Sequence, residues 1–151
     1  GDLSLSNLDV EPFRAPAEIQ HKCHWLIPDR FMTGKSPNND EELMHVLTND
    51  LGINTFVNLT DKAIDEEKQR AQIEYIHFPI KNFEVGDDGN TIQLMTDIMR
   101  RLNETECKIY SHCNSGHGRA GVIAALLLQC VYGMDDEVSR AYLKLVHTTR
   151  C

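Results

Sequence analysis

The chain has 151 residues, a length that predicts one domain with a sizeable core over residues 1–151, of which residues 1–20 form an irregular arm. Hydrophobic residues make up 41% and charged residues 25%, as in ordinary soluble globular proteins, and no apolar run approaches the ~18 residues of a membrane span. The net charge of −8 argues against nucleic acid or an anionic membrane as the main partner.

Two β-rich segments follow the arm. Residues 24–28 and 30–34 predict short strands joined by a turn at Pro28-Asp29, and Trp25 is expected to anchor the core. Residues 40–49 carry apolar side chains at helical spacing and therefore predict a helix.

The next segments alternate between strand and helix patterns. Residues 53–59 and 74–80 predict strands, and the charged residues 61–71 between them predict a solvated crossover helix. This order indicates parallel strands in an α/β sheet. Because His77 lies within the second strand, we expect it to have a structural role rather than to act as a catalytic base.

An acidic loop over residues 81–90 precedes a helix over residues 91–102, and a last amphipathic helix is expected over residues 135–146. The residues of the first helix expected to face inward are Ile92, Leu94, Met95, Ile98 and Leu102.

Residues 109–128 have the pattern of a strand, a glycine-containing turn and a buried helix. Ile109-Tyr110 predicts the end of a strand, and the apolar run from Val122 to Leu128 predicts the helix. Cys113 therefore lies between the carboxyl end of a strand and the start of a helix. Free N–H groups and the positive end of the helix dipole favour a bound anion there, and also a thiolate.

The residues after Cys113 suit a phosphoryl group. Gly116 and Gly118 allow the backbone N–H groups to approach a ligand, and Arg119 can donate to two phosphate oxygens at once. His112 could hold the turn by hydrogen bonding and favour the thiolate. We therefore expect the sulfur of Cys113 to attack phosphorus. The expected phosphate-binding residues are Asn114, Ser115, Gly116, His117, Gly118 and Arg119.

His112, Cys113 and Arg119, with glycines at 116, 118 and 121, resemble the signature loop of the cysteine-based protein tyrosine phosphatases, and the segment order resembles their dual-specificity branch. The resemblance implies a central, mostly parallel twisted sheet flanked by helices. It also implies hydrolysis of phosphotyrosine, and of phosphoserine or phosphothreonine, through a phosphocysteine intermediate. The substrate would be a phosphorylated protein, and neither a metal nor a cofactor is expected.

The resemblance also implies an aspartic acid, just after the strand at 74–80, that protonates the leaving oxygen. Asn82 stands nearest to that position and cannot act as an acid. Asp87 is our candidate, with Asp88 and Glu84 as alternatives; a slow enzyme that needs good leaving groups, or an Asp→Asn change made to trap substrate, would also explain Asn82.

A second departure from the family is Ala120, where the family has a hydroxyl that helps the sulfur to leave. Intermediate hydrolysis would then be slower, unless Ser115 compensates. His117 would add positive charge to the phosphate pocket if protonated.

These departures keep other functions open. One alternative is a catalytically weak module that binds phosphorylated partners, and another is a hydrolase of a phosphoinositide, sugar phosphate or RNA 5′ phosphate. The loop has no lysine, which argues against a phosphoinositide. A sulfur transferase is a further alternative. The sequence leaves open the physiological substrate, the oligomeric state and whether the native chain extends beyond Cys151.

The cysteines are odd in number, at positions 23, 107, 113, 130 and 151, without paired spacing. This pattern favours a reducing compartment, so we expect a cytoplasmic protein that could also enter the nucleus. Cys130 is expected in the core. Cys23 or Cys107 could protect an oxidised Cys113 through a disulfide.

Overall fold

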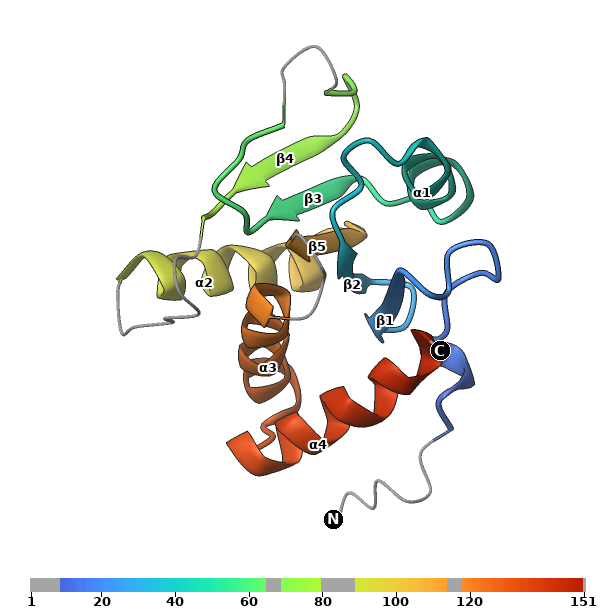
Figure 1. The fold of residues 1–151 in the computed structure, drawn as a ribbon. Coiled ribbons are helices and arrows are strands. Elements are labelled where there is room, and N and C mark those ends of the chain that lie inside the picture. Colours follow the sequence, from blue (N-terminus) through green and yellow to red (C-terminus); the bar gives the residue numbers. More distant parts are fainter. Residues whose placement is uncertain (1–8, 65–68, 80–88, 114–117, 151) are drawn as a thin grey trace.

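The computed structural model describes residues 9–64, 69–79, 89–113 and 118–150, and for residues 89–90 and 118–120 the backbone alone. Five strands form one sheet in the order β1-β2-β5-β3-β4 (Figure 1). They are β1 (Cys23–Ile27), β2 (Phe31–Lys35), β3 (Thr55–Asn58), β4 (Glu74–His77) and β5 (Ile109–Cys113). Strands β1 and β2 are antiparallel and all other neighbours are parallel, so the predicted α/β fold is confirmed.

The β1–β2 hairpin forms where the sequence predicts it. Asp29, after Pro28, adopts a left-handed conformation with φ of 64°, which closes the turn. Trp25 is buried, as expected of a core anchor.

The helices are α1 (Glu41–His45), continued by a π-helical turn (Val46–Asp50), α2 (Gly89–Glu104), α3 (Gly118–Tyr132) and α4 (Asp136–His147). Aspartate side chains cap the N-termini of α1 and α4. Asp40 accepts a hydrogen bond from the Leu43 N–H at 3.1 Å, and Asp135 accepts one from the Val138 N–H at 2.8 Å. Such caps satisfy N–H groups that the helix itself leaves unpaired.

Successive residues of β5 face opposite sides of the sheet. Tyr110 and His112 share one side, which α1 covers, whereas Ser111 and Cys113 share the other. Helices α2, α3 and α4 lie on the Cys113 side (Figure 1). The central strand β5 is buried throughout, so the two layers of helices enclose it.

The predicted helix over residues 61–71 is wrong where the structure describes it, because residues 61–64 and 69–71 are not helical. The amide of Asn58 and the hydroxyl of Thr60 both donate to the Lys62 carbonyl, at 2.9 and 3.0 Å. Hydrogen bonds from side chains to the backbone compete with helix formation, and here they hold a tight turn after β3. Residues 65–68 lie outside the described part.

Helix α2 was predicted correctly except for one inward position. Leu94, Met95 and Ile98 are buried, but Ile92 is 63% exposed. Thr91 takes the inward place in the first turn instead. One residue along a helix turns the side chain by about 100°, so Ile92 falls outside the buried stripe.

Within residues 9–20 of the predicted arm, Phe13, Ala15 and Ile19 are buried against the rest of the protein. Phe13 is buried, with its ring edge-on to that of Tyr142 at 5.7 Å between centroids, and Arg14 forms an isolated bridge with His24 of β1. These contacts join the described arm to α4 and β1; the single-domain organisation stays a prediction. Within the described ranges, no helix is both long and apolar enough to cross a membrane.

Candidate active site

Cys113 is the last residue of β5, as predicted, and only 4% of it is exposed. Helix α3 begins five residues later, at Gly118, so the predicted strand and the predicted helix on either side of residues 114–117 are confirmed. Arg119 is the second residue of α3; its side chain lies outside the described part. The thiol therefore lies near a helix N-terminus, where backbone N–H groups and the helix dipole favour anions.

Most of the other predicted site residues lie outside the described residues. This is true of Asn114, Ser115, Gly116 and His117, which follow Cys113, and of Asn82, Glu84, Asp87 and Asp88, where the sequence predicted an acidic loop. Gly118 and Ala120 have described backbones in the first turn of α3. The roles predicted for all these residues stay predictions.

His112 precedes Cys113 but faces the other side of the sheet. Its ring is fully buried, between 5.9 and 6.3 Å from the rings of Tyr110 and Phe56, and neither ring nitrogen has a partner among the described residues. Burial, with a smaller effect of His77, lowers the pKa of His112 to about 4. A neutral ring has no charge with which to favour a thiolate, so only its predicted role in holding the turn stays open.

His77 has the structural contact that its strand position predicted. Its Nε2 lies 2.7 Å from the Thr60 carbonyl oxygen, and the Thr60 hydroxyl donates to Asn58 at 2.7 Å. The Leu59 N–H donates to the His112 carbonyl at 2.9 Å. The turn after β3 is thus tied both to β4 and to the residue before Cys113.

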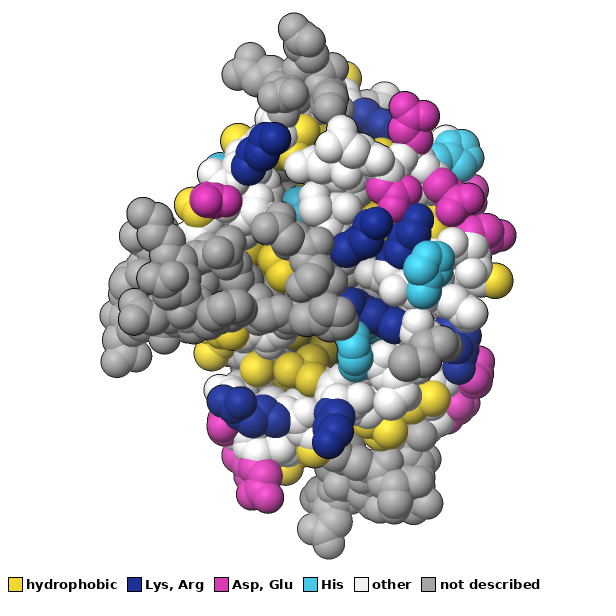
Figure 2. All heavy atoms as spheres, in the orientation of Figure 1, with side chains coloured by type: hydrophobic (Ala, Val, Ile, Leu, Met, Phe, Trp, Pro, Cys, Tyr) yellow, Lys and Arg dark blue, Asp and Glu magenta, His cyan; other side chains and the backbone are white. Residues whose placement is uncertain are grey.

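Lys35 is a site neighbour that the sequence interpretation missed. It pairs in register with Cys113, and its ammonium lies 3.1 Å from Asp40, which also binds Lys22 at 2.8 Å. Burial would raise the pKa of Asp40, but hydrogen bonds from Lys22, the Leu43 N–H and Lys35 lower it to about 2. Figure 2 shows basic side chains beside acidic ones on this face. The turn itself has no lysine, yet parallel pairing brings one beside Cys113.

Tyr110 and Gly34 lock β2 against β5 next to the site. The Tyr110 hydroxyl donates to the Lys35 carbonyl at 2.6 Å. A Cβ atom on Gly34 would lie 2.3 Å from that hydroxyl oxygen and 2.4 Å from the Cβ of Cys23. Glycine is therefore required here for the close approach of the tyrosine.

The expectations for three cysteines are wrong. Cys23 is separated from β5 by β2, about 10 Å at ~4.8 Å per strand, and Cys107 precedes Cys113 by six residues along extended chain, about 20 Å. A disulfide needs Cα atoms within roughly 7 Å, so neither can reach Cys113 without a large rearrangement. Burial also raises the pKa of Cys23 to about 12. Cys130 is exposed, because it lies in the last turn of α3 at the margin of the buried stripe.

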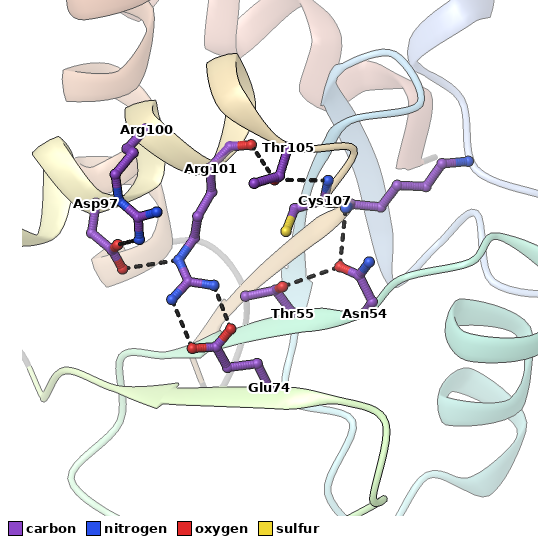
Figure 3. A network of polar contacts seen from close by, with 9 residues as sticks. Asn54, Thr55, Glu74, Asp97, Arg100, Arg101, Thr105 and Cys107 are labelled. Atoms are coloured by element: carbon purple, nitrogen blue, oxygen red, sulfur yellow. Dashed lines mark hydrogen bonds and ion pairs between the residues drawn. The ribbon is translucent and has the colours of Figure 1, made fainter.

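The opposite, amino edge of the sheet carries a network that ties α2 to β4 (Figure 3). Arg101 binds Glu74 through both terminal nitrogens, one at 2.7 Å, and Asp97 through Nε at 3.0 Å. Beside it, the Asn54 side chain accepts a hydrogen bond from the Lys108 N–H at 3.1 Å. The Arg101 hydrogen bonds lower the pKa of Glu74.

Within the described ranges, no group of three or more His, Cys, Asp or Glu side chains could hold a metal ion.

A family model described as the Swiss Army Knife protein, DSP-PTPase phosphatase domain, matches residues 20–150. The chain belongs to this family. It is thus a phosphatase-type domain of the dual-specificity and tyrosine phosphatase group, and the predicted resemblance is confirmed.

Relatives of this DSP-PTPase domain carry the same kind of name. A protein of Invertebrate iridescent virus 6, 197R, named as a tyrosine phosphatase, is 38% identical over 101 residues, which are 62% of this chain and 36% of that protein. Protein 067L of Invertebrate iridescent virus 3, named likewise, is 26% identical over 141 residues, 86% of this chain and 55% of that protein. The chain thus spans about a third to a half of these relatives.

The DSP-PTPase domain also shares its fold with solved structures. The crystal structure of a cysteine-to-serine variant of P. aeruginosa TpbA in complex with pTyr superposes with a TM-score of 0.71, covering 93% of this chain and 82% of that one, at 15% identity. This likeness confirms the fold.

Proposed function

We propose that the protein hydrolyses phosphotyrosine, and phosphoserine or phosphothreonine, in protein substrates through a phosphocysteine intermediate on Cys113. The observation that carries this proposal is the position of Cys113, buried at the carboxyl end of the central strand and followed five residues later by the start of α3. Such a setting brings a sulfur nucleophile and anion-binding N–H groups to one point.

The proposed reaction has two steps. The Cys113 thiolate attacks phosphorus, a sulfur–phosphorus bond forms, and the ester bond breaks with a proton passing to the leaving oxygen. Water then cleaves the sulfur–phosphorus bond and releases inorganic phosphate. The N–H groups of residues 114–118 and the guanidinium of Arg119 would hold the equatorial oxygens. Neither step requires a metal ion or a cofactor.

Protein substrates are supported by the relatives. Two viral relatives are named as tyrosine phosphatases, and the TpbA structure is a complex with pTyr. Lys35, which pairs in register with Cys113, forms an ion pair with Asp40, so side chains of both charges come from the end of β2 and the segment that follows it. A phosphorylated protein is therefore the proposed partner.

The test is hydrolysis of p-nitrophenyl phosphate and of a phosphotyrosine peptide by wild type and Cys113→Ser. We expect the variant to lose roughly 10³-fold or more in kcat/KM, because a hydroxyl replaces the thiolate nucleophile. Cys130→Ser is the matched control, since Cys130 is exposed near the end of α3, and its rates should equal those of wild type. Equal rates for Cys113→Ser and wild type would exclude the proposal.

We place the general acid at Asp87. Asp87→Asn should slow a phosphoserine peptide, whose alkoxide leaves poorly, much more than p-nitrophenyl phosphate, whose leaving group departs unaided. Asp88→Asn and Glu84→Gln are the matched variants. The same selective loss in one of those two variants, with Asp87→Asn unaffected, would move the acid to that residue.

Ala120, in the first turn of α3, favours one alternative, a phosphate-binding module with weak catalysis. Without a hydroxyl at this position the sulfur would leave the intermediate slowly. Tight binding of a phosphotyrosine peptide by wild type, with no release of phosphate from either substrate, would select this alternative over the hydrolase.

A further inference from the structure

A groove of about 520 Å³ lies against α1, between the segment that follows β2 and the crossover from β3 to β4. The first wall follows Lys35, which pairs in register with Cys113. The second wall follows Asn58, which pairs in register with His112. Because β2 and β3 lie on either side of β5, both walls start at the edge of the sheet that carries Cys113. A polypeptide that enters the candidate active site can therefore continue into this groove.

The groove has the size and the lining of a binding site. Ligand sites in proteins have volumes of roughly 300–1,000 Å³, with apolar walls and a few charged groups. The half-buried side chains of Met44 and Ile64 supply apolar walls here, and the exposed side chains of Glu41 and Arg70 supply one charge of each sign. All four side chains are accessible from solvent. The lining thus suits a short stretch of polypeptide that carries both charged and apolar groups.

Arg70 is held in place, yet its charge has no ionic partner. Its Nη1 donates to the Thr48 hydroxyl at 2.9 Å, and that hydroxyl donates to the Met44 carbonyl at 2.8 Å. The Arg70 backbone N–H donates to the Tyr75 hydroxyl at 3.1 Å. Arg70 makes no ion pair with any described residue. Since a guanidinium has five N–H donors, those that do not face Thr48 remain for a ligand.

The contact between Arg70 and Thr48 does more than join the crossover to α1. Thr48 belongs to the π-helical turn Val46–Asp50, and such turns are rare and occur frequently at functional sites. Joining the two segments requires a single hydrogen bond and no charge. A guanidinium fixed in this way loses less conformational entropy when it pairs with a carboxylate. The arrangement therefore favours recognition of an acidic side chain.

The two charges lie at opposite ends of the groove. Glu41 is in the first turn of α1, where the helix dipole favours acids, and it makes no ion pair with the described part of the chain. Since α1 follows the carboxyl end of β2 and leads to the amino end of β3, Glu41 lies nearer to the edge of Cys113 than Thr48 does. Positions 41 and 48 are about 10 Å apart along a helix, a distance that about three extended residues cover.

We propose that this groove binds the substrate polypeptide next to its phosphorylated residue and selects an acidic side chain, which pairs with Arg70. A basic side chain about three residues nearer to the phosphorylated residue pairs with Glu41, and the apolar parts of the segment contact Met44 and Ile64. The occupant is thus a phosphorylated protein segment with two opposite charges. This inference rests on the proposed function and adds a sequence preference to it.

The test uses phosphotyrosine peptides that carry one charged residue, either glutamate or lysine, at each flanking position in turn. At one position, kcat/KM of wild type should favour glutamate over lysine by about fivefold, as one partly exposed ion pair provides. Arg70→Glu should reverse this preference. Arg140→Glu makes the same change at an exposed arginine of α4 and should keep the wild-type preference. Each comparison is made between peptides within one variant, so a change in overall activity cancels.

Glu41→Lys gives an independent readout at the other end of the groove. Wild type should favour lysine at a position about three residues nearer to the phosphotyrosine, and the variant should favour glutamate there. Glu42→Lys is the matched control, because it makes the same change in the same turn of α1 at a residue that does not line the groove. Equal changes in both variants would show a general effect of charge and overturn the role of Glu41.

Binding of the same peptides to Cys113→Ser separates this inference from the proposed function. If Cys113→Ser binds them with the expected charge preference but wild type hydrolyses none, the proposed hydrolysis fails and the groove stands. If wild type hydrolyses all peptides equally well, the groove fails and the proposed function stands. A preference that Arg70→Glu shares with wild type would belong to another surface and would also overturn the proposal.

Discussion

The two edges of the sheet differ in how many of their polar side chains have hydrogen-bond or ion-pair partners. At the amino edge, Arg101 binds two carboxylates, and Arg30 donates to the carbonyls of Leu102, Thr105 and Cys107 at 2.9 to 3.1 Å. Every one of these charged groups has a partner. The amino edge thus fastens α2 and the start of β5 to the rest of the sheet.

Toward the carboxyl edge several buried polar groups are unpaired, although the Asn58 and Thr60 side chains there are hydrogen-bonded. The hydroxyls of Thr33 and Ser111 and both ring nitrogens of His112 have no partner among the described residues. All of them lie within two register positions of Cys113. Buried polar groups without a hydrogen-bond partner lower the free energy of unfolding. In native proteins such groups are found most often at functional sites. The two edges therefore differ in how completely their buried polar groups are paired, and the less completely paired edge is the one that carries Cys113.

The largest effect on stability is expected from removing the Arg30 hydrogen bonds at the amino edge of the sheet. Arg30→Met should lower the free energy of unfolding by about 4 kcal/mol, because two of the three carbonyls that lose their charged donor are partly buried. Urea unfolding measures this loss, and kcat should stay at the wild-type value. An equal loss of kcat would show that the two edges are not independent.

The next effect depends on pH. The pKa of His112 is about 4 in the folded protein against 6.5 ordinarily, so the unfolded state takes up the proton first. This contribution to stability is fully present above pH 6.5 and falls by roughly 3 kcal/mol as the pH drops to 4. His112→Phe should lack this fall in urea unfolding, whereas His45→Gln, at an exposed histidine, should keep it. Parallel pH curves for wild type and His112→Phe would contradict the expectation.

A smaller loss is expected from Arg101→Gln. The Arg101 side chain is 13% exposed, but Glu74 is 53% exposed, so solvent screens part of the pairing. We expect a loss of about 1.5 kcal/mol in unfolding free energy, reduced at high salt. The control is Arg140→Gln, an exposed ion pair that should cost less than ~0.5 kcal/mol.

The smallest effect has the opposite sign. Ser111→Ala removes a buried hydroxyl without a partner and should raise the free energy of unfolding by roughly 1 kcal/mol. Ser139→Ala is its matched control, because the equally buried Ser139 hydroxyl donates to the Asp135 carbonyl at 2.6 Å, so its loss should cost about 1 kcal/mol. Two losses of similar size would erase the contrast between paired and unpaired groups.

Sequence reasoning succeeded where a structure depends on local spacing. The strand before Cys113, the helix after it and the amphipathic helices α2 and α4 follow from periodicity, glycine placement and capping, all of which act over a few residues. It failed at residues 61–64, where Asn58 and Thr60 bind the backbone and override a helical composition. The prediction that Ile92 faces inward was wrong for a related reason, because periodicity defines the buried face of a helix less sharply at the helix end.

The sequence by itself determined that this chain would be an α/β phosphatase-type domain with Cys113 between a strand and a helix, because that motif is continuous in the chain. Only the tertiary structure decided that Lys35 lies beside Cys113, that Arg70 meets Thr48 along a groove, and that Arg30 caps the end of α2. These neighbours are tens of residues apart, and their meeting depends on strand register and helix packing, for which no local pattern exists.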